Sequence, residues 1–284
     1  MKKWLATILI ICGMAVSSII SIHSLYKIHK EKRTEEISAI ARLPFAMARE
    51  MVLEFQGVAS DYLMLKTLTF HGEKLIKEEE ITRDEWMMTL RALQQIVNLD
   101  PRFWDPYVMA EMSLPWDANM VQETNELLHR AAEYRLNDYR PYFYLWFNYY
   151  YFLNDPGSAA PYLEKASQKP GAPSYFATLA ARMHFYAGHT QSGILFLQDM
   201  IAQTDDPTYK KNMQKRLESL KKLLFLENKV AEFKKLFSKP PKSLEELVEK
   251  GLLSDIPQDP YGGKFFIMKN GKVYTTSKLA QPAK

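Results

Sequence analysis

The chain has 284 residues, of which 47% are apolar and 13% aromatic, so it is able to bury a core and is not a disordered chain. The formal charge of +4 comes from the N-terminus, because the first 33 residues hold six Lys/Arg and one acid, whereas the remainder holds 31 basic and 32 acidic residues. A nearly neutral body gives no support for nucleic-acid binding through a general basic field. The single cysteine, Cys12, excludes an intrachain disulfide.

The N-terminal segment, residues 1–33, is predicted to anchor the chain in a membrane. Residues 4–22 carry no charge and are bordered by lysines on both sides. At ~1.5 Å per residue, a helix of this length spans roughly the hydrocarbon core of a bilayer. We therefore expect membrane contact through residues 4–26. A cleaved signal peptide is the alternative, but the apolar run is long and no small-x-small cleavage site follows it.

The orientation of this anchor is predicted from its two flanks. The short start Met-Lys-Lys-Trp resembles bacterial N-terminal signal anchors, which implies a single-pass protein of the inner membrane with most of its chain in the periplasm. The four Lys/Arg between residues 27 and 33 favour the reverse orientation by the positive-inside rule. We expect the periplasmic orientation and keep the reverse as the alternative.

Residues 34–207 are predicted to form helical hairpins. Two stretches that begin at Arg140 and Ser174, 34 residues apart, each read as a helix, a turn and a second helix. Bulky residues recur at helical spacing in the first stretch, and small residues mark the same face in the second. The predicted core positions are Phe143, Trp146, Phe147, Tyr150, Ala159, Leu163, Ala166, Ala177, Ala180, Ala181, His184, Gly193, Leu197 and Met200.

This pattern resembles the tetratricopeptide repeat, whose units are helix pairs with small residues at their close approaches. The resemblance implies an all-α solenoid of three to four units between about residues 45 and 205, with a protein-binding groove. The family's clamp for C-terminal carboxylates is not expected, because Tyr144 and Leu179 stand where Lys and Asn are required. The predicted groove positions are Tyr144, Asn148, Tyr151, Phe152, Tyr175, Thr178, Arg182 and Phe185. A groove filled by another helix of the same chain is the alternative.

An earlier helix is expected in the stretch "GVASDYLMLKTLTFHGEKL". Apolar residues recur there at helical spacing, and Asp61 and Lys66 lie on the opposite side. This helix is predicted to pack through Val58, Tyr62, Leu65 and Leu68.

Residues 208–241 are predicted to form a basic helix that caps the solenoid. Its apolar stripe consists of Met213, Leu217, Leu220 and Leu224, and lysines occupy the other sides. A helix that rests on anionic lipid headgroups or on an acidic partner is the alternative.

Residues 242–284 are predicted to form a short helix followed by a β-hairpin. Ser243 and Glu246 have capping-box spacing, Gly251 is suited to end the helix, and Asn270-Gly271 is a two-residue hairpin turn signal. The order of helix, Asp-Pro-aromatic-Gly turn and hairpin resembles the C-terminal part of the pseudopilins of type II secretion. Asp255 and Asp259 supply too few oxygen ligands for the calcium site of some of those proteins.

No catalytic, cofactor-binding or metal-binding residue is predicted. The six histidines lack metal-ligand spacing, and neither a phosphate-binding loop nor a Gly-x-Ser-x-Gly elbow occurs. The preferred function is a membrane-anchored, extracytoplasmic scaffold or adaptor that binds a protein partner within a secretion, pilus or envelope-assembly complex. A periplasmic holding chaperone for extended exported polypeptides is the alternative, and an enzyme accessory domain or an enzyme proper is a third possibility.

Overall fold

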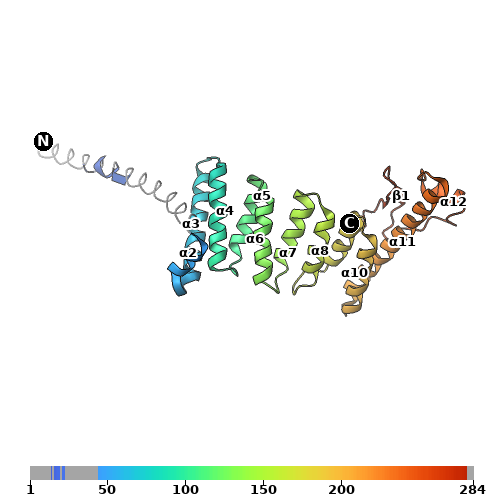
Figure 1. The fold of residues 1–284 in the computed structure, drawn as a ribbon, viewed down its shortest axis with the longest axis horizontal. Coiled ribbons are helices and arrows are strands. Elements are labelled where there is room, and N and C mark those ends of the chain that lie inside the picture. Colours follow the sequence, from blue (N-terminus) through green and yellow to red (C-terminus); the bar gives the residue numbers. More distant parts are fainter. Residues whose placement is uncertain (1–13, 15, 20, 23–43, 280–284) are drawn as a thin grey trace, which may run out of the picture. The chain divides into compact units, whose positions relative to one another are not determined.

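The computed structural model describes residues 14, 16–19, 21, 22 and 44–279. The predicted membrane segment, residues 4–26, therefore lies largely outside the described residues. Among the helices that are described, none combines the length and the apolar character needed to cross a bilayer. The described chain is mainly helical with one two-stranded antiparallel sheet near its C-terminal end, as predicted (Figure 1). It divides into two compact units between Tyr134 and Arg135, each with its own core.

The first unit consists of helical hairpins (Figure 1). The helix α3 packs on α4, and α5 packs on both α4 and α6. Thr82 and Glu85 begin α4 with a capping box, in which each side chain accepts from the other residue's backbone N–H. The elements are α2 (Phe45–Val52), η1 (Leu53–Phe55), α3 (Gln56–Ile76), α4 (Arg83–Leu99), α5 (Asp105–Asp117) and α6 (Val121–Tyr134).

The helix α3 forms where it was predicted, but it packs through a different face. The predicted packing residues Val58, Tyr62, Leu65 and Leu68 are 68%, 49%, 62% and 49% exposed. The residues buried instead are Ser60, Leu63, Met64 and Thr67. Ser60 and Thr67 tolerate this position because each hydroxyl donates to a carbonyl of the preceding helical turn. The predicted face was wrong because apolar residues lie on both sides of α3, so its periodicity does not distinguish them.

The second unit begins with two helical hairpins, α7–α8 and α9–α10, in which α8 packs on both α7 and α9. Ala159, Ala177 and Ala181 are fully buried at these contacts, as predicted. The helices α9 and α10 approach closely at Gly193, where an added Cβ would lie 2.9 Å from the carbonyl oxygen of Ala181. The elements are α7 (Arg140–Phe147), η2 (Asn148–Phe152), α8 (Pro156–Ser167), α9 (Phe176–Tyr186), α10 (Thr190–Gln203), α11 (Pro207–Phe237), α12 (Leu244–Glu249), β1 (Phe265–Ile267) and β2 (Val273–Thr275).

The aromatic stretch of α7 continues into η2, a turn of π-helix. Trp146 is buried as predicted, whereas Tyr150 is 37% exposed and the prediction of a core role for it was wrong. The wider π turn explains the difference, because it rotates the residues after Phe147 away from a regular 3.6-residue period. Stacked rings cover part of the exposed surface, with Trp146 and Tyr150 centroids 5.9 Å apart and Phe147 and Tyr151 centroids 5.1 Å apart.

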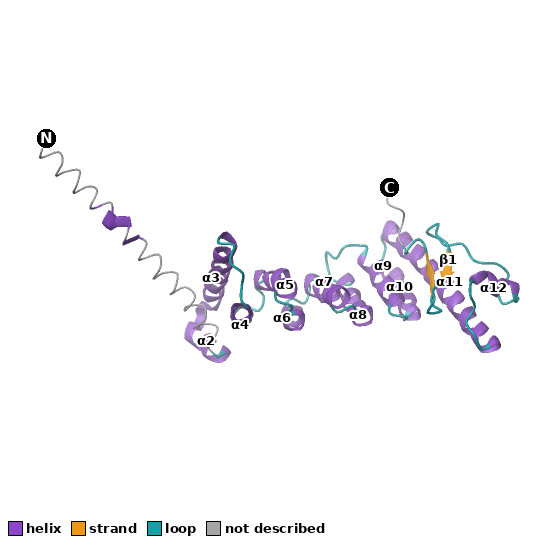
Figure 2. Ribbon diagram, turned by 90° about the horizontal axis from the view of Figure 1, so that it is seen from above, coloured by secondary structure: helices purple, strands orange, loops and turns teal. Residues whose placement is uncertain are grey.

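The helix α11 is a central element of the second unit rather than an outer cap. It contacts α9 and α10, and it also contacts α12 and β2. Figure 2 shows the strands beside α11. Met213 and Leu220 are buried as predicted, and Phe233 extends the buried stripe toward the end of the helix.

The C-terminal hairpin has a different turn from the one predicted. Its register pairs Phe266 with Tyr274 and Ile267 with Val273. Beyond Ile267, the N–H of Met268 donates to the carbonyl of Lys272, which leaves a three-residue loop in place of two. Gly271 has a φ of +82°, a left-handed conformation that suits glycine at the end of such a loop.

Candidate functional site

The hairpin lies against the C-terminal end of α9. Lys272 Nζ donates to the carbonyl oxygens of Phe185 and Tyr186 at 2.6 and 3.1 Å. Because the last carbonyls of a helix lack intrahelical donors and carry partial negative charge, an ammonium group stabilises this end. Burial lowers the pKa of Lys272, and the negative charge of Glu227 opposes that shift. The ring of Tyr274 meets the ring of Phe185 edge-on, with centroids 5.2 Å apart.

This arrangement corrects the prediction for two of the groove residues. Phe185 is only 1% exposed because the hairpin covers it, and Asn148 is fully buried. Neither side chain therefore has an exposed surface on which a partner could lie. The occupant of this part of α9 is the chain itself, but it is a β-hairpin and not the helix considered as the alternative.

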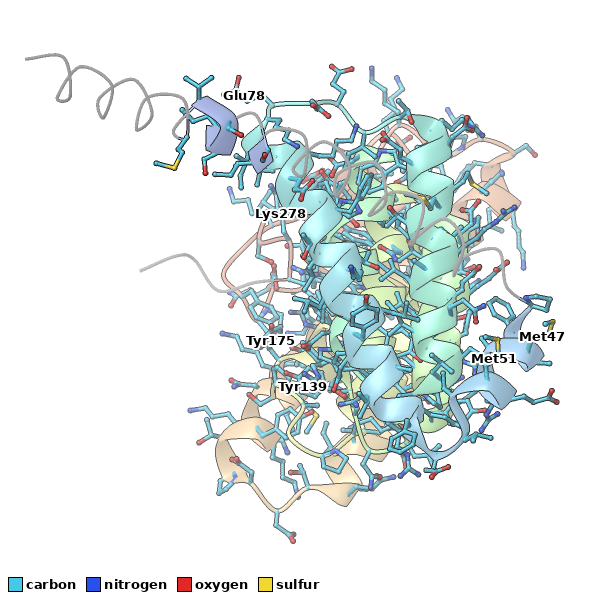
Figure 3. The ribbon with its side chains drawn as sticks, turned by 90° about the vertical axis from the view of Figure 1, so that its left-hand side faces the viewer. Met47, Met51, Glu78, Tyr139, Tyr175 and Lys278 are labelled. Carbon is cyan, nitrogen blue, oxygen red and sulfur yellow. The ribbon has the colours of Figure 1, made fainter. Side chains whose placement is uncertain are left out.

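The other predicted groove residues differ in their accessibility. Tyr151 and Tyr175 are 57% and 58% exposed, and Tyr175 is labelled in Figure 3. Tyr144 and Phe152 are half-buried against neighbouring rings. Thr178 and Arg182 are half-buried, and both side chains donate to backbone carbonyls, those of Tyr175 and Lys278 respectively.

An apolar cavity of about 550 Å³ lies between η2, the end of α9 and the hairpin. The contribution of the hairpin to this cavity was not predicted from the sequence, although Phe266 and Tyr274 are cross-strand partners and so share one face. The lining residues are Tyr150, Phe185, Tyr186, Phe266, Tyr274, Thr275, Thr276, Lys278 and Leu279.

A second cavity, the polar cavity, has a volume of about 230 Å³ and lies at the start of α9 beside α11. Its positive charge surrounds Tyr261, with Lys215 Nζ 4.7 Å and Arg216 Cζ 5.0 Å from the ring centroid. The lining residues are Ser174, Tyr175, Thr178, Asn212, Lys215, Arg216 and Tyr261.

Arg216 is the central charge of the polar cavity. Its side chain is buried, with 6% of the residue exposed. Burial lowers the pKa of Arg216 to about 10, the positive charge of Arg182 adds to that shift, and Asp259 opposes it. Within the described residues, no hydrogen-bond acceptor reaches the buried Nε and Nη1 of Arg216 or the Nε of Arg182.

The nearby carboxylate of Asp259 is already saturated with donors. It accepts from the Tyr261 N–H at 2.9 Å, from Ser277 Oγ at 2.5 Å, and from the hydroxyls of Ser219 and Thr275. Burial alone would raise the pKa of Asp259, but these hydrogen bonds outweigh it and hold the pKa below its ordinary value. Asp259 therefore organises the turn and leaves the Nε and Nη1 donors of Arg216 unpaired.

The site residues predicted from the sequence do not include Lys215, Arg216 or Tyr261. A signal for Arg216 was present, because it lies three residues after Met213 and four before Leu220, on the buried stripe of α11. The positive charge of Arg216 did not distinguish it from the many solvated lysines of α11. Tyr261 was read only as part of the Asp-Pro-aromatic-Gly turn.

Among the described residues, no group of three or more His, Cys, Asp or Glu is arranged to hold a metal ion. Comparison with protein-family models, with curated proteins and with solved structures found no match. The class of protein defined by the described chain is thus a mainly helical one, in which a C-terminal β-hairpin lines an apolar cavity and the turn before it lines a cationic one.

Proposed function

We propose that this protein is a membrane-anchored scaffold that binds an extended segment of a partner protein along α9. The observation that carries the proposal is the position of Arg182 relative to the two cavities. Its guanidinium donates to the carbonyl of Lys278, which lines the apolar cavity, and its charge acts on Arg216 and Tyr261 of the polar cavity. A single extended ligand is able to use both cavities.

Exposed aromatic side chains near the cavities support this function. Tyr150, Tyr151 and Tyr175 each have more than a third of their surface exposed. Tyrosine combines a broad apolar face with a hydroxyl group, and aromatic and arginine side chains dominate the binding energy of protein interfaces. The positions of the helices support the tetratricopeptide-like solenoid as the scaffold, because α8 and α10 begin 34 residues apart and α7 and α9 begin 36 residues apart.

The membrane anchor and the periplasmic location are part of the same proposal. They rest on the charge-free residues 4–22 and on the basic start of the chain. A scaffold of a secretion, pilus or envelope-assembly complex agrees with these features.

A holding chaperone is the second candidate, and the exposed apolar face of α3 is the observation that favours it. Val58, Tyr62 and Leu65 form a continuous apolar stripe there. Such stripes bind apolar segments of many sequences without strong selection.

Site-specific photocrosslinking in membranes of the native host tests the proposal. A photoreactive amino acid at Tyr175 is compared with one at Gln198, an exposed position on α10. The scaffold predicts one crosslinked protein of constant stoichiometry from position 175 and none from position 198. Many crosslinked species favour the chaperone, and no crosslink from position 175 or equal crosslinking from both positions contradicts binding along α9.

A further inference from the structure

We propose that the polar cavity binds a carboxylate group of the partner polypeptide, with Arg216 as the principal donor and with Arg182 and Lys215 as flanking charges. This inference rests on the proposed function, because it names the chemistry that the site along α9 recognises. The binding site is composed of α9, α11 and the Tyr261 turn.

The unpaired donors of Arg216 are the first argument. A guanidinium group presents its N–H donors as a planar fork that matches the two oxygens of a carboxylate. In Arg216 the Nε and Nη1 donors, which lie on two different edges of the guanidinium group, are buried and lack an acceptor among the described residues. Leaving charged donors unpaired in the interior is unfavourable, so an anionic acceptor at this place stabilises the folded protein.

The local charge balance is the second argument. Lys215 and Arg216 lie over the ring of Tyr261, the charge of Arg182 also acts on Tyr261, and Asp259 is a carboxylate whose charge acts on Arg216. Since the oxygens of Asp259 already accept four hydrogen bonds, they do not neutralise the guanidinium through direct contact. The polar cavity therefore has excess positive charge.

The neighbourhood of the polar cavity indicates which anion it takes. Its volume of about 230 Å³ suits a side chain rather than a large cofactor. The Arg182 guanidinium lies 5.9 Å from the Tyr186 ring centroid, and Tyr186 lines the apolar cavity. A ligand that occupies both cavities thus carries an anionic group close to an apolar side chain. An acidic residue next to a large apolar residue in a polypeptide has this chemistry, whereas inorganic phosphate has not.

The test measures peptide binding to the full chain in detergent micelles by fluorescence anisotropy. The probe is fluorescein-labelled Gly-Ser-Glu-Phe-Leu-Ser-Gly-amide, and the matched control replaces Glu with Gln. We expect the Glu peptide to bind at least tenfold more tightly than the Gln peptide, with an affinity that falls as salt increases. Equal affinities of the two peptides would overturn the proposal.

Further arms of the same measurement identify the source of the anion. A Gln peptide with a free C-terminal carboxylate reports recognition of a chain end, and tighter binding of this peptide than of the Glu peptide assigns the cavity to a C-terminus. Preference for the Glu peptide and preference for the free C-terminus both support binding of a carboxylate group in the polar cavity. Competition by inorganic phosphate at the concentration of the Glu peptide would instead assign the cavity to phosphate and overturn the peptide proposal.

The variant Arg216→Met tests the principal donor. Arg216→Met should lower the affinity for the Glu peptide at least tenfold and leave the affinity for the Gln peptide unchanged. The matched control is Lys221→Met on the exposed side of α11, which should bind both peptides as the parent does. Because burial disfavours the charged form of Arg216, Arg216→Met should melt at the same temperature as the parent or higher. A lower melting temperature together with unchanged Glu-peptide binding would show that Arg216 is only structural.

A second variant, Lys215→Met, keeps the test valid if Arg216→Met does not fold. Lys215 is half-buried at the cavity edge, so its loss should weaken the Glu peptide severalfold without unfolding the protein. Unchanged binding by this variant would contradict the flanking role. If Arg216→Met abolishes the Glu preference while crosslinking from position 175 persists, both proposals stand. If the Glu preference is absent and crosslinking persists, only the carboxylate inference fails.

Discussion

The helices α3 and α9 each begin a helical hairpin, and each carries aromatic or aliphatic residues on the side away from its partner. On α9 that side is covered, since Lys272 and Tyr274 of the hairpin lie on Phe185. On α3 no comparable cover exists among the described residues, and Val58 and Leu65 remain more than 60% exposed. The same apolar pattern therefore becomes core in one helix and surface in the other, depending on what a distant part of the chain supplies.

The surface next to α3 continues the contrast. Met47 and Met51 of α2 are 49% and 67% exposed, and both are labelled in Figure 3. Methionine-rich apolar surfaces adapt to varied partners. The covered side of α9 instead offers fixed cavities with buried charge, which favours a selective ligand.

The largest expected effect separates the covered side chain of α9 from the exposed one of α3. Phe185→Ala should lower the free energy of unfolding by about 3–5 kcal/mol, because it removes a buried ring and leaves a cavity. Leu65→Ala, at a position 62% exposed, should change it by less than about 0.5 kcal/mol. Urea unfolding followed by circular dichroism measures both. Similar losses in the two variants would contradict the assignment of α3 as surface.

The next effect tests the turn that holds the hairpin in place. Asp259→Asn should cost about 2–3 kcal/mol at neutral pH, because hydrogen bonds to a charged acceptor are replaced by weaker ones. The folded pKa of Asp259 lies below the ordinary value of 3.8, so its stabilisation is fully present above that pH and is lost as the pH falls further. The difference in the free energy of unfolding between the parent and Asp259→Asn should narrow below about pH 4. If urea unfolding gives the same difference in free energy at pH 7 and at pH 3, the charged carboxylate of Asp259 does not stabilise the turn.

A pair of glycine substitutions compares the packing of the two regions. Gly193→Ala should destabilise the protein by about 1–2 kcal/mol, since the new methyl group would lie 2.9 Å from a carbonyl oxygen of α9. Gly72→Ala in α3 is the control, because nothing lies within 4 Å of the added Cβ. It should stabilise the helix by about 0.5–1 kcal/mol. Thermal melts that rank the two variants in the opposite order would refute the close approach at Gly193.

The smallest expected effect concerns the surface of α3 itself. The double variant Val58→Ser/Leu65→Ser should leave the free energy of unfolding within about 1 kcal/mol of the parent. The chaperone activity of the variant is measured by how well it suppresses the aggregation of a chemically unfolded test protein. Loss of suppression would support the chaperone, whereas unchanged suppression excludes the α3 face as its client site.

Much of the fold could be read from the sequence because its signals are local. Asp155 begins α8 by accepting from the Ser158 N–H at 3.0 Å, and Gly188 and Gly251 end helices with φ of +81° and +74°. The small residues of α8 and α9 mark the close helix contacts at which they are found. Such features depend on residues a few positions apart, so they can be predicted without knowledge of the rest of the chain.

The candidate site was predictable only in part. Tyr151 and Tyr175 are exposed, so they remain available to a partner, but Phe185 and Asn148 are buried. The π turn at η2 displaced the later aromatic residues from the expected faces. The burial of Arg216 was not predicted, because a basic residue on a lysine-rich helix is usually solvated.

The sequence by itself determined that this protein is helical, that its helices form hairpins with close contacts at small residues, and that a β-hairpin follows near residue 270. Only the tertiary structure decided which face of α3 is exposed and that Lys272 and Tyr274 cover Phe185. It also decided that Arg216 lies buried beside Tyr261. The physical reason is that caps, turns and periodicity act over a few residues. Burial and charge pairing depend instead on contacts between residues 45 to 90 positions apart, such as Arg216 with Tyr261 and Phe185 with Tyr274.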